Sequence, residues 1–394
     1  MTNQINKNFK QAYLTENKDV IAKHIEDSPF IDFVNGDNIV RGIYAERYFP
    51  ISIDENIIEK YWLLRRKALL FDVPEKPIEI TGEDSEKFLD YIFCRNLNGV
   101  KIGRGYYCLA CTPQGGIFMD GILFKLETNR YWYVQADGQF ETWLLANSNG
   151  FNIHISNPHV WVLQIQGPAS TSILKDASNN LLDETFGYYK SDFFDLDGQK
   201  IYVSRTGYTN ELGYELYCPS DINHKALWDH LMKCGAPYGM EFSSTRAMTM
   251  RRIEGGIREN LVDMDITVSP YDVGLGQFVD LDKENFIGKT SLQNINKENM
   301  LFGVLCENTV PEINSKIIMS ENEIGKITSG TFSPTLKCGI GFLRLNSPIK
   351  IVGKEVQILK NDKTLENCTV VDLPFFDHEK KIARGLDKSI PQIS

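Results

Sequence analysis

The strongest constraint on the fold is a change in the sequence pattern after Leu292. Beyond this point the chain consists of short runs of strand-forming residues that are separated by turn residues. These runs are 303–306, 324–329, 339–343, 355–359 and 367–371. Short strands at nearly regular spacing are typical of a small barrel or sandwich. The sequence therefore predicts a separate C-terminal β domain over residues 293–394.

The residues before this change mix helices with strands. Residues 54–70 carry Ile57, Tyr61 and Leu64 at helical spacing, which predicts an amphipathic helix. Other helices are predicted at 84–94, 140–147, 224–233 and 245–254. Strands are predicted at 77–82, 106–111, 117–126, 131–135, 160–166, 198–204 and 214–217. This pattern predicts an α+β region over residues 39–292.

Two segments are expected to lack regular structure. Residues 1–38 are polar with few periodic apolar positions, so we expect a loosely held arm whose extreme end is disordered. Gly, Pro and Asp become frequent between residues 255 and 288, which indicates loops that cross a domain junction. No repeat or long linker separates the two regions, so we expect the domains to pack together.

Composition limits the partners of this protein. The 394 residues carry a formal net charge of −10, so the whole molecule does not attract nucleic acid or anionic lipid. No stretch approaches the roughly 20 apolar residues of a membrane-spanning helix. The first residues also lack the apolar core of a signal peptide. We expect a cytoplasmic protein with neither a nucleic-acid nor a membrane partner.

The sequence carries no signature of a metal or nucleophile site. The one close cysteine pair, Cys108 and Cys111, lacks a second Cys or His pair at zinc spacing. We therefore expect these cysteines to be free thiols within strands, and no metal. The six histidines fall in no catalytic pattern, and no Gly-x-Ser-x-Gly, Walker or dinucleotide motif is present. These absences disfavour hydrolases, metalloenzymes and nucleotide-binding proteins.

Asp120 is the first candidate for chemistry. It is the only charged residue in the run Ile117–Phe124, in which both alternating faces are apolar. A buried carboxylate is costly unless it is paired or used. Functional use is one interpretation, and a carboxylate held by the backbone amides of a hairpin is the other.

Glu215 is the second candidate. It follows a turn containing Gly207, Asn210 and Gly213, and it shares a strand face with Tyr217. A carboxylate there can accept two parallel hydrogen bonds from an amidine-like edge, such as that of a pterin or guanine. The alternative is an ion pair with an arginine such as Arg205. The adjacent Arg251 and Arg252 carry less weight, because neighbouring helical arginines are more often solvated or paired than used for anion binding.

Taken together, the motifs of this chain resemble the folate-dependent aminomethyltransferase family, which includes the T-protein of glycine cleavage. The resemblance covers about residues 39–376. Each motif is short, but their order and spacing are specific. The segments are Leu70–Val73, Gly115–Asp120, Ile165–Pro168, Ser204–Thr209, Gly213–Glu215, Val273–Gly276, Asn285–Lys289, Thr328–Thr335 and Leu373–Phe375.

The resemblance implies a three-domain cloverleaf. Residues 39–292 would form two interleaved α+β subdomains with antiparallel sheets around a central tetrahydrofolate channel, and residues 293–394 would form a β-barrel. By position, Glu215 would bind the pterin ring, and Tyr107, Tyr208 and Tyr217 would line the channel. Asp120 would lie beside the reactive folate nitrogens.

Two departures from glycine-cleavage T-proteins bear on the reaction. Met119 precedes Asp120 where those proteins usually carry a second Asp, and Ala247–Arg252 lacks their first Arg and its neighbouring Asp. The run Arg252–Gly256 is more similar to the demethylase branch, which is typified by dimethylsulfoniopropionate demethylase. The sequence thus favours methyl transfer from a small methylated sulfonium, methoxy or methylamino donor to N5 of tetrahydrofolate.

Two alternatives remain open. One is a true T-protein, which takes an aminomethyl group from a lipoyl carrier protein and forms 5,10-methylenetetrahydrofolate. The other is a folate-binding module without catalysis.

Overall fold

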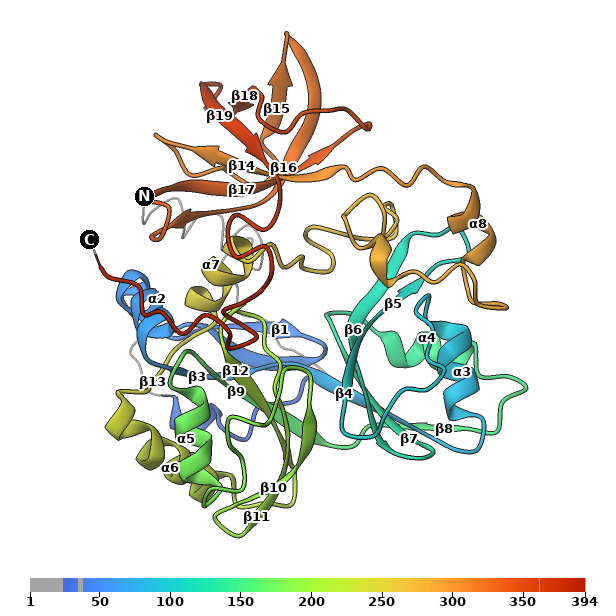
Figure 1. The fold of residues 1–394 in the computed structure, drawn as a ribbon, viewed down its shortest axis with the longest axis vertical. Helices are drawn as coiled ribbons and strands as arrows, with labels where there is room; N and C mark the ends of the chain where they lie inside the picture. The colour runs from blue at the N-terminus through green and yellow to red at the C-terminus, as the bar shows by residue number, and fades with distance from the viewer. Residues whose placement is uncertain (1–23, 35–37, 361, 394) are drawn as a thin grey trace.

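The computed structural model describes residues 24–34, 38–360 and 362–393, and it forms three lobes (Figure 1). Among the described residues, two mixed α/β lobes and one barrel surround a central region. The predicted α+β cloverleaf with antiparallel sheets and a C-terminal barrel is therefore confirmed. The expected disorder at the extreme N-terminus lies outside the described residues.

The larger sheet has the strand order β10-β11-β12-β9-β3-β13 in the described chain. Its neighbours are antiparallel except for β13 and β3, which run parallel. The strands are β3 (Leu69–Val73), β9 (Val160–Gln166), β10 (Ser191–Leu196), β11 (Gln199–Ser204), β12 (Gly213–Pro219) and β13 (Glu241–Phe242). This lobe is interleaved, because β3 precedes the other sheet in sequence whereas β9 follows it.

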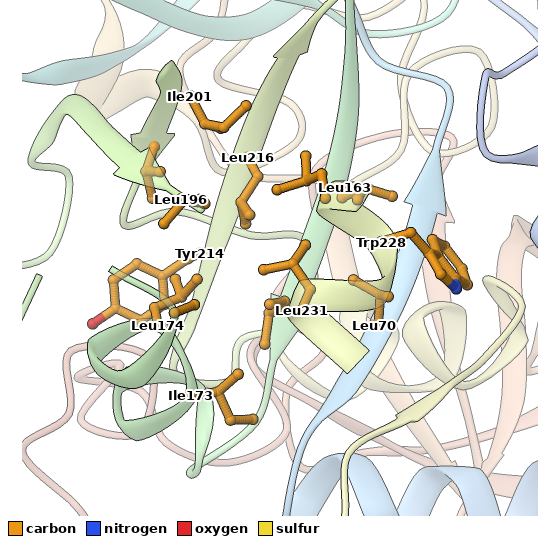
Figure 2. Close-up of a cluster of buried hydrophobic side chains, with 14 of the residues drawn as sticks. Leu70, Leu163, Ile173, Leu174, Leu196, Ile201, Tyr214, Leu216, Trp228 and Leu231 are labelled. Atoms are coloured by element: carbon orange, nitrogen blue, oxygen red, sulfur yellow. The ribbon is translucent and has the colours of Figure 1, made fainter. Parts of the chain in front are cut away.

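Two helices cover one face of the larger sheet, α5 (Ser170–Ala177) and α6 (His224–Gly235). Figure 2 shows how Ile173 and Leu231 from these helices meet Leu163 and Leu216 from the strands. Burial of these side chains stabilises the lobe and fixes the register of β9 against β12, in which Gln164 pairs with Glu215. The core therefore determines which residues meet on the opposite face.

The smaller sheet has the order β5-β6-β7-β4-β8 within the described residues. Its strands are β4 (Lys76–Thr81), β5 (Gly105–Cys111), β6 (Ile117–Glu127), β7 (Arg130–Gln135) and β8 (His154–Ser156), and helices α3 (Ser85–Ile92) and α4 (Phe140–Ala146) pack on it. The predicted hairpin is present as β5 and β6, with Leu109 opposite Asp120. Gly115 in its turn has φ +88°, which favours glycine.

The C-terminal strands close into a barrel of order β14-β17-β16-β15-β18-β19 in the described part. Its strands are β14 (Leu301–Cys306), β15 (Lys316–Met319), β16 (Asn322–Ser333), β17 (Cys338–Leu345), β18 (Glu355–Leu359) and β19 (Leu365–Val371). The sequence missed β15, which has four residues, of which only Ile317 is buried. A disulfide joins Cys306 to Cys368, which the sequence did not anticipate, whereas Cys108 and Cys111 are free as expected.

Helices α2 (Ile57–Arg66) and α7 (Arg246–Glu254) pack together between the larger sheet and the barrel (Figure 1). The Asn56 side chain caps α2 by accepting from Ile58 and Glu59 N–H groups. The predicted loop region 255–288 holds only η3 (Gly276–Phe278), and α8 (Lys289–Asn294) follows it. The loops that the sequence predicted between residues 255 and 288 are therefore present.

The N-terminal part of the chain is more ordered than its polarity predicted. Phe30 is fully buried and Val34 nearly so, and both belong to the core of the larger sheet. A turn, η1 (Ile31–Phe33), connects them. The hairpin of β1 (Val40–Tyr44) and β2 (Arg47–Ser52) follows. This segment therefore packs against the larger sheet, because burial of the Phe30 and Val34 side chains stabilises it although the neighbouring residues are polar.

Candidate functional site

Glu215 lies on β12 with its carboxylate held by a ring of donors. Its Oε2 atom accepts hydrogen bonds from Tyr217 and Thr206 hydroxyls at 2.7 Å, and from Ser204 at 3.4 Å. Its Oε1 atom accepts from Gln164 Nε2 at 3.2 Å. The side chain is 7% exposed. Neutral donors thus fix this carboxylate without cancelling its charge.

The ion-pair alternative for Glu215 is not formed. Arg205 donates instead to the carbonyl oxygen of Phe186 at 3.3 Å, and no described Lys or Arg lies within ion-pair distance of Glu215. Burial raises the pKa of Glu215, although the hydroxyl donors oppose this shift. A buried carboxylate without a cation is a candidate ligand-binding group.

Asp120 lies on β6, and Tyr107 faces it from β5. The Tyr107 hydroxyl donates to Asp120 Oδ2 at 2.9 Å, while Asp120 Oδ1 is buried without a hydrogen-bond partner. Burial raises the pKa of Asp120 to about 6, and the Tyr107 hydrogen bond limits the shift. Asp120 therefore changes its charge near pH 6 and has one oxygen atom free to bind.

The tyrosines that the sequence singled out have different surroundings. Tyr107 and Tyr208 are partly buried, and the Tyr208 hydroxyl donates to the carbonyl oxygen of Arg258 at 3.1 Å. Tyr217 is fully buried, with its hydroxyl on Glu215 and its ring edge-on to Phe124. Tyr217 therefore orients Glu215 and presents no exposed surface of its own.

Glu75 is a further carboxyl group that sequence reasoning missed. Its Oε1 atom accepts from Gln164 Nε2 at 3.2 Å, so one amide group bridges Glu75 and Glu215. Its Oε2 atom and Gln164 Oε1 are buried without hydrogen-bond partners. Burial and the neighbouring Glu215 raise the pKa of Glu75 to about 8. An acidic residue just beyond the fully buried strand Leu69–Val73 was the available signal.

The tip of the β1–β2 hairpin reaches the same region. Ala45 N–H donates to Asp137 Oδ1 at 2.8 Å, which fastens the tip to the loop after β7. Tyr44, next to Ala45, is partly buried, and burial together with the carboxylates of Glu75 and Asp120 raises its pKa. Tyr44 thus lies near both candidate carboxylate sites, although the two belong to different sheets.

Two cations lie in segments that follow α7 and the last barrel strand. Arg258 donates to the carbonyl oxygens of Val273 at 2.9 Å and Gly256 at 2.6 Å, and neither Arg258 nor Lys380 forms an ion pair with a described residue. The Lys380 side chain is solvent-accessible, yet surrounding protein and the like charge of Arg258 lower its pKa. This pair can accept an anionic group.

Arg251 and Arg252 on α7 form ion pairs and are buried. The sequence favoured paired or solvated arginines over anion binding, and the structure shows that they are paired. Arg251 is fully buried between Glu211 and Glu254. Arg252 contacts Asp263 and Glu259 at 2.7 Å each. Since every charge here has a partner, this cluster fits a structural role better than anion binding.

Two kinds of feature are absent from the described residues. No cluster of three or more His, Cys, Asp or Glu side chains has metal-binding geometry among them. No helix in the described ranges is long and apolar enough to cross a membrane.

Comparison with known proteins identifies the family. The family model described as "GCVT N-terminal domain" matches residues 40–283, and "Glycine cleavage T-protein C-terminal barrel domain" matches residues 300–377. This protein therefore belongs to the glycine cleavage T-protein family, as the motifs indicated.

Similar proteins support this assignment. An "Aminomethyltransferase" of Caldanaerobacter subterraneus subsp. tengcongensis is 30% identical over 349 residues, which cover 86% of this chain and 92% of the relative. Another from Alkaliphilus oremlandii is 31% identical and covers 83% and 91%. The crystal structure of glycine cleavage system aminomethyltransferase T from Bartonella henselae has a TM-score of 0.81 at 24% identity, covering 90% of this chain and 98% of that one. It has the same fold.

Proposed function

We propose that this protein is a tetrahydrofolate-dependent transferase of a one-carbon unit, and that the unit is an aminomethyl group. The single observation that carries this proposal is family membership along nearly the whole chain, with relatives that are named aminomethyltransferases. These names favour the reaction that the sequence placed second. A lipoyl carrier protein is then the partner that delivers the group.

The residues present fit tetrahydrofolate at both of its ends. Its pterin edge offers neighbouring N–H donors, and Glu215 supplies buried acceptor oxygens without a contacting cation, with the Glu75 carboxyl group joined to it through Gln164. Its glutamate tail carries carboxylates, and Arg258 and Lys380 are cations without a described ion-pair partner. We assign Tyr107 and Tyr208 to the channel between these ends, and Tyr217 to the positioning of Glu215.

When bound, tetrahydrofolate supplies the ring nitrogen that accepts the one-carbon unit. Asp120 is the described carboxylate best suited to act there, because Oδ1 lacks a partner and the group is mostly ionised at neutral pH. It can stabilise positive charge that develops nearby, or hold a proton that the reaction releases. Tyr107 fixes its orientation through the hydrogen bond to Oδ2.

Methyl transfer from a small methylated donor is the second candidate. It is favoured by Met119, which is 1% exposed and lies directly before Asp120, so a single carboxylate stands where a pair would otherwise be. A sulfonium donor needs mainly alignment, because its leaving group is a neutral thioether. We also propose residues 39–292 as the folate-binding unit and 293–394 as the barrel unit.

The oxidation level of the folate product separates the two reactions. Tetrahydrofolate is incubated either with an aminomethylated lipoyl carrier protein or with a panel of sulfonium, methoxy and methylamino compounds, and the product is identified by mass. Methylenetetrahydrofolate with release of ammonia supports aminomethyl transfer, whereas 5-methyltetrahydrofolate supports the second candidate. Tight folate binding with neither product would show a non-catalytic module and overturn both.

A further inference from the structure

The surroundings of the Glu75 carboxyl group are unusual, because one of its oxygens is buried without a hydrogen-bond partner. Gln164 is fully buried on β9, and its amide nitrogen lies 3.2 Å from one oxygen of Glu75 and 3.2 Å from one oxygen of Glu215. The two carboxyl groups therefore cannot be further apart than twice that distance. No described cation contacts either carboxyl group, so two negative charges would repel each other here.

The charged groups around Glu75 do not remove this repulsion. Arg47 donates to the backbone carbonyl of Glu75 at 2.8 Å, but its side chain is directed to Glu26 at 3.2 Å. Lys76, the next residue, pairs with Glu46. The remaining titratable neighbours are acidic or phenolic, namely Asp72 on β3, Tyr44 on β1 and Tyr217 on β12. Uptake of one proton by the two carboxyl groups would remove this repulsion.

We propose that Glu75 is a second pterin-contacting group, and that Glu75 and Glu215 together carry one proton. Glu215, which already accepts hydroxyl and amide donors, stays ionised and receives the ring N–H and the amino group of the pterin. Glu75 is protonated and donates its O–H to the neighbouring pterin carbonyl oxygen. The inference rests on the proposed function, because it deepens the description of the folate site.

The chemistry of the ligand edge explains why one carboxylate and one carboxylic acid are needed. A pterin amide edge presents two donors followed by one acceptor. Two ionised carboxylates would place an acceptor against that carbonyl oxygen, which costs the desolvation of an unpaired polar group. The orphaned Glu75 Oε2 atom is the described atom available to supply the missing donor.

Calorimetric titration of the full chain with tetrahydrofolate between pH 7 and pH 9 tests the inference. Since the pKa of Glu75 is about 8, the wild-type protein should lose about tenfold in affinity across this range as the second carboxyl group ionises. Near pH 8.5 the binding enthalpy should depend on the buffer, because binding takes up a proton. Glu75→Gln keeps a neutral donor, so its affinity should match that of the wild type at pH 7 and stay constant to pH 9.

Two further variants complete the test. Glu75→Ala removes the donor and should bind about tenfold more weakly at pH 7, as expected for one lost hydrogen bond. Glu59→Gln, an exposed glutamate on α2, is the matched control and should reproduce the wild-type pH profile. An unchanged affinity in Glu75→Ala, or a wild-type pH profile in Glu75→Gln, would overturn the inference alone. Failure of the wild-type protein to bind tetrahydrofolate would overturn the proposed function with it.

Discussion

Two regions of this protein bury ionisable side chains, and they differ in how charge is balanced. In the helix α7 cluster every arginine meets carboxylates. In the strand-end cluster the carboxyl groups have neutral donors and no contacting cation. The first cluster consists of Arg65, Glu211, Arg251, Glu254, Arg252, Glu259 and Asp263, and the second of Asp72, Glu75 and Glu215.

The contrast separates structural from functional burial of charge. A buried ion pair that is complete offers nothing to a ligand, but its disruption leaves an uncompensated charge. Burial without a neighbouring cation raises the pKa of a carboxyl group, and this group remains able to bind the hydrogen-bond donors of a ligand. The α7 cluster also hydrogen-bonds to the barrel through Ser329 and Thr328. We therefore assign a role in folding stability to the α7 cluster and a role in ligand recognition to the cluster around Glu75 and Glu215.

The largest effect is expected in the arginine cluster. Arg252→Met leaves the buried carboxylates of Asp263 and Glu259 without their cation, which should lower the free energy of unfolding by about 3–5 kcal/mol. Chemical denaturation gives this value, and Arg66→Met on the exposed side of α2 should stay within about 0.5 kcal/mol of the wild type. An Arg252→Met protein as stable as the control would contradict the structural role.

Asp120→Asn should affect the rate more than folding or folate affinity. A carboxylate that acts on the transition state is expected to contribute roughly a hundredfold to kcat. Because its pKa is raised to about 6, the ionised fraction and hence turnover should rise through pH 6 and level off above pH 7. This rising limb should vanish in Asp120→Asn.

The structural alternative for Asp120 gives a different pattern. If the carboxylate only supported the hairpin, Asp120→Asn would lower the melting temperature and preserve turnover per folded molecule. The raised pKa also means that Asp120 makes the wild-type fold lose stability as the pH rises from about 4 to about 6, and the variant should lose less over this range because only groups such as Glu75 still contribute. Measuring melting and turnover on one preparation distinguishes the two cases.

Glu215→Gln should weaken tetrahydrofolate binding with the fold intact. One acceptor becomes a donor that faces the pterin donors, so a loss of roughly 1.5–3 kcal/mol in binding free energy is expected. Calorimetric titration measures it, with circular dichroism as the check on folding. Unchanged affinity in a well-folded variant would remove Glu215 from the site.

The smallest effect is expected for Tyr217→Phe, which removes one of the hydroxyl donors to Glu215. Thr206 and Ser204 remain, so the loss in folate affinity should be about 0.5–1.5 kcal/mol. KM for folate should rise while kcat stays near the wild-type value, since Tyr217 acts only through Glu215. A drop in kcat at constant KM would assign Tyr217 a different role.

The sequence predicted the elements that carry the candidate site more completely than the contacts within it. The hairpin around Asp120 and the strand with Glu215 follow from alternating apolar residues and Gly-rich turns, which are local signals. The predicted helix 54–70 was too long, because the buried strand β3 already begins at Leu69. Local helix propensity does not show where a helix ends because the following residues pair with a neighbouring strand.

The sequence by itself determined the family, the α+β lobes followed by a barrel, and Asp120 and Glu215 as unusual carboxyl groups. Only the tertiary structure placed Glu75 beside Glu215, because the pairing of β9 with both β3 and β12 brings Gln164 between them. Residues 75, 164 and 215 are far apart in the chain, and their proximity depends on strand register. That register is set by the buried core on the opposite face of the sheet, which no local pattern encodes.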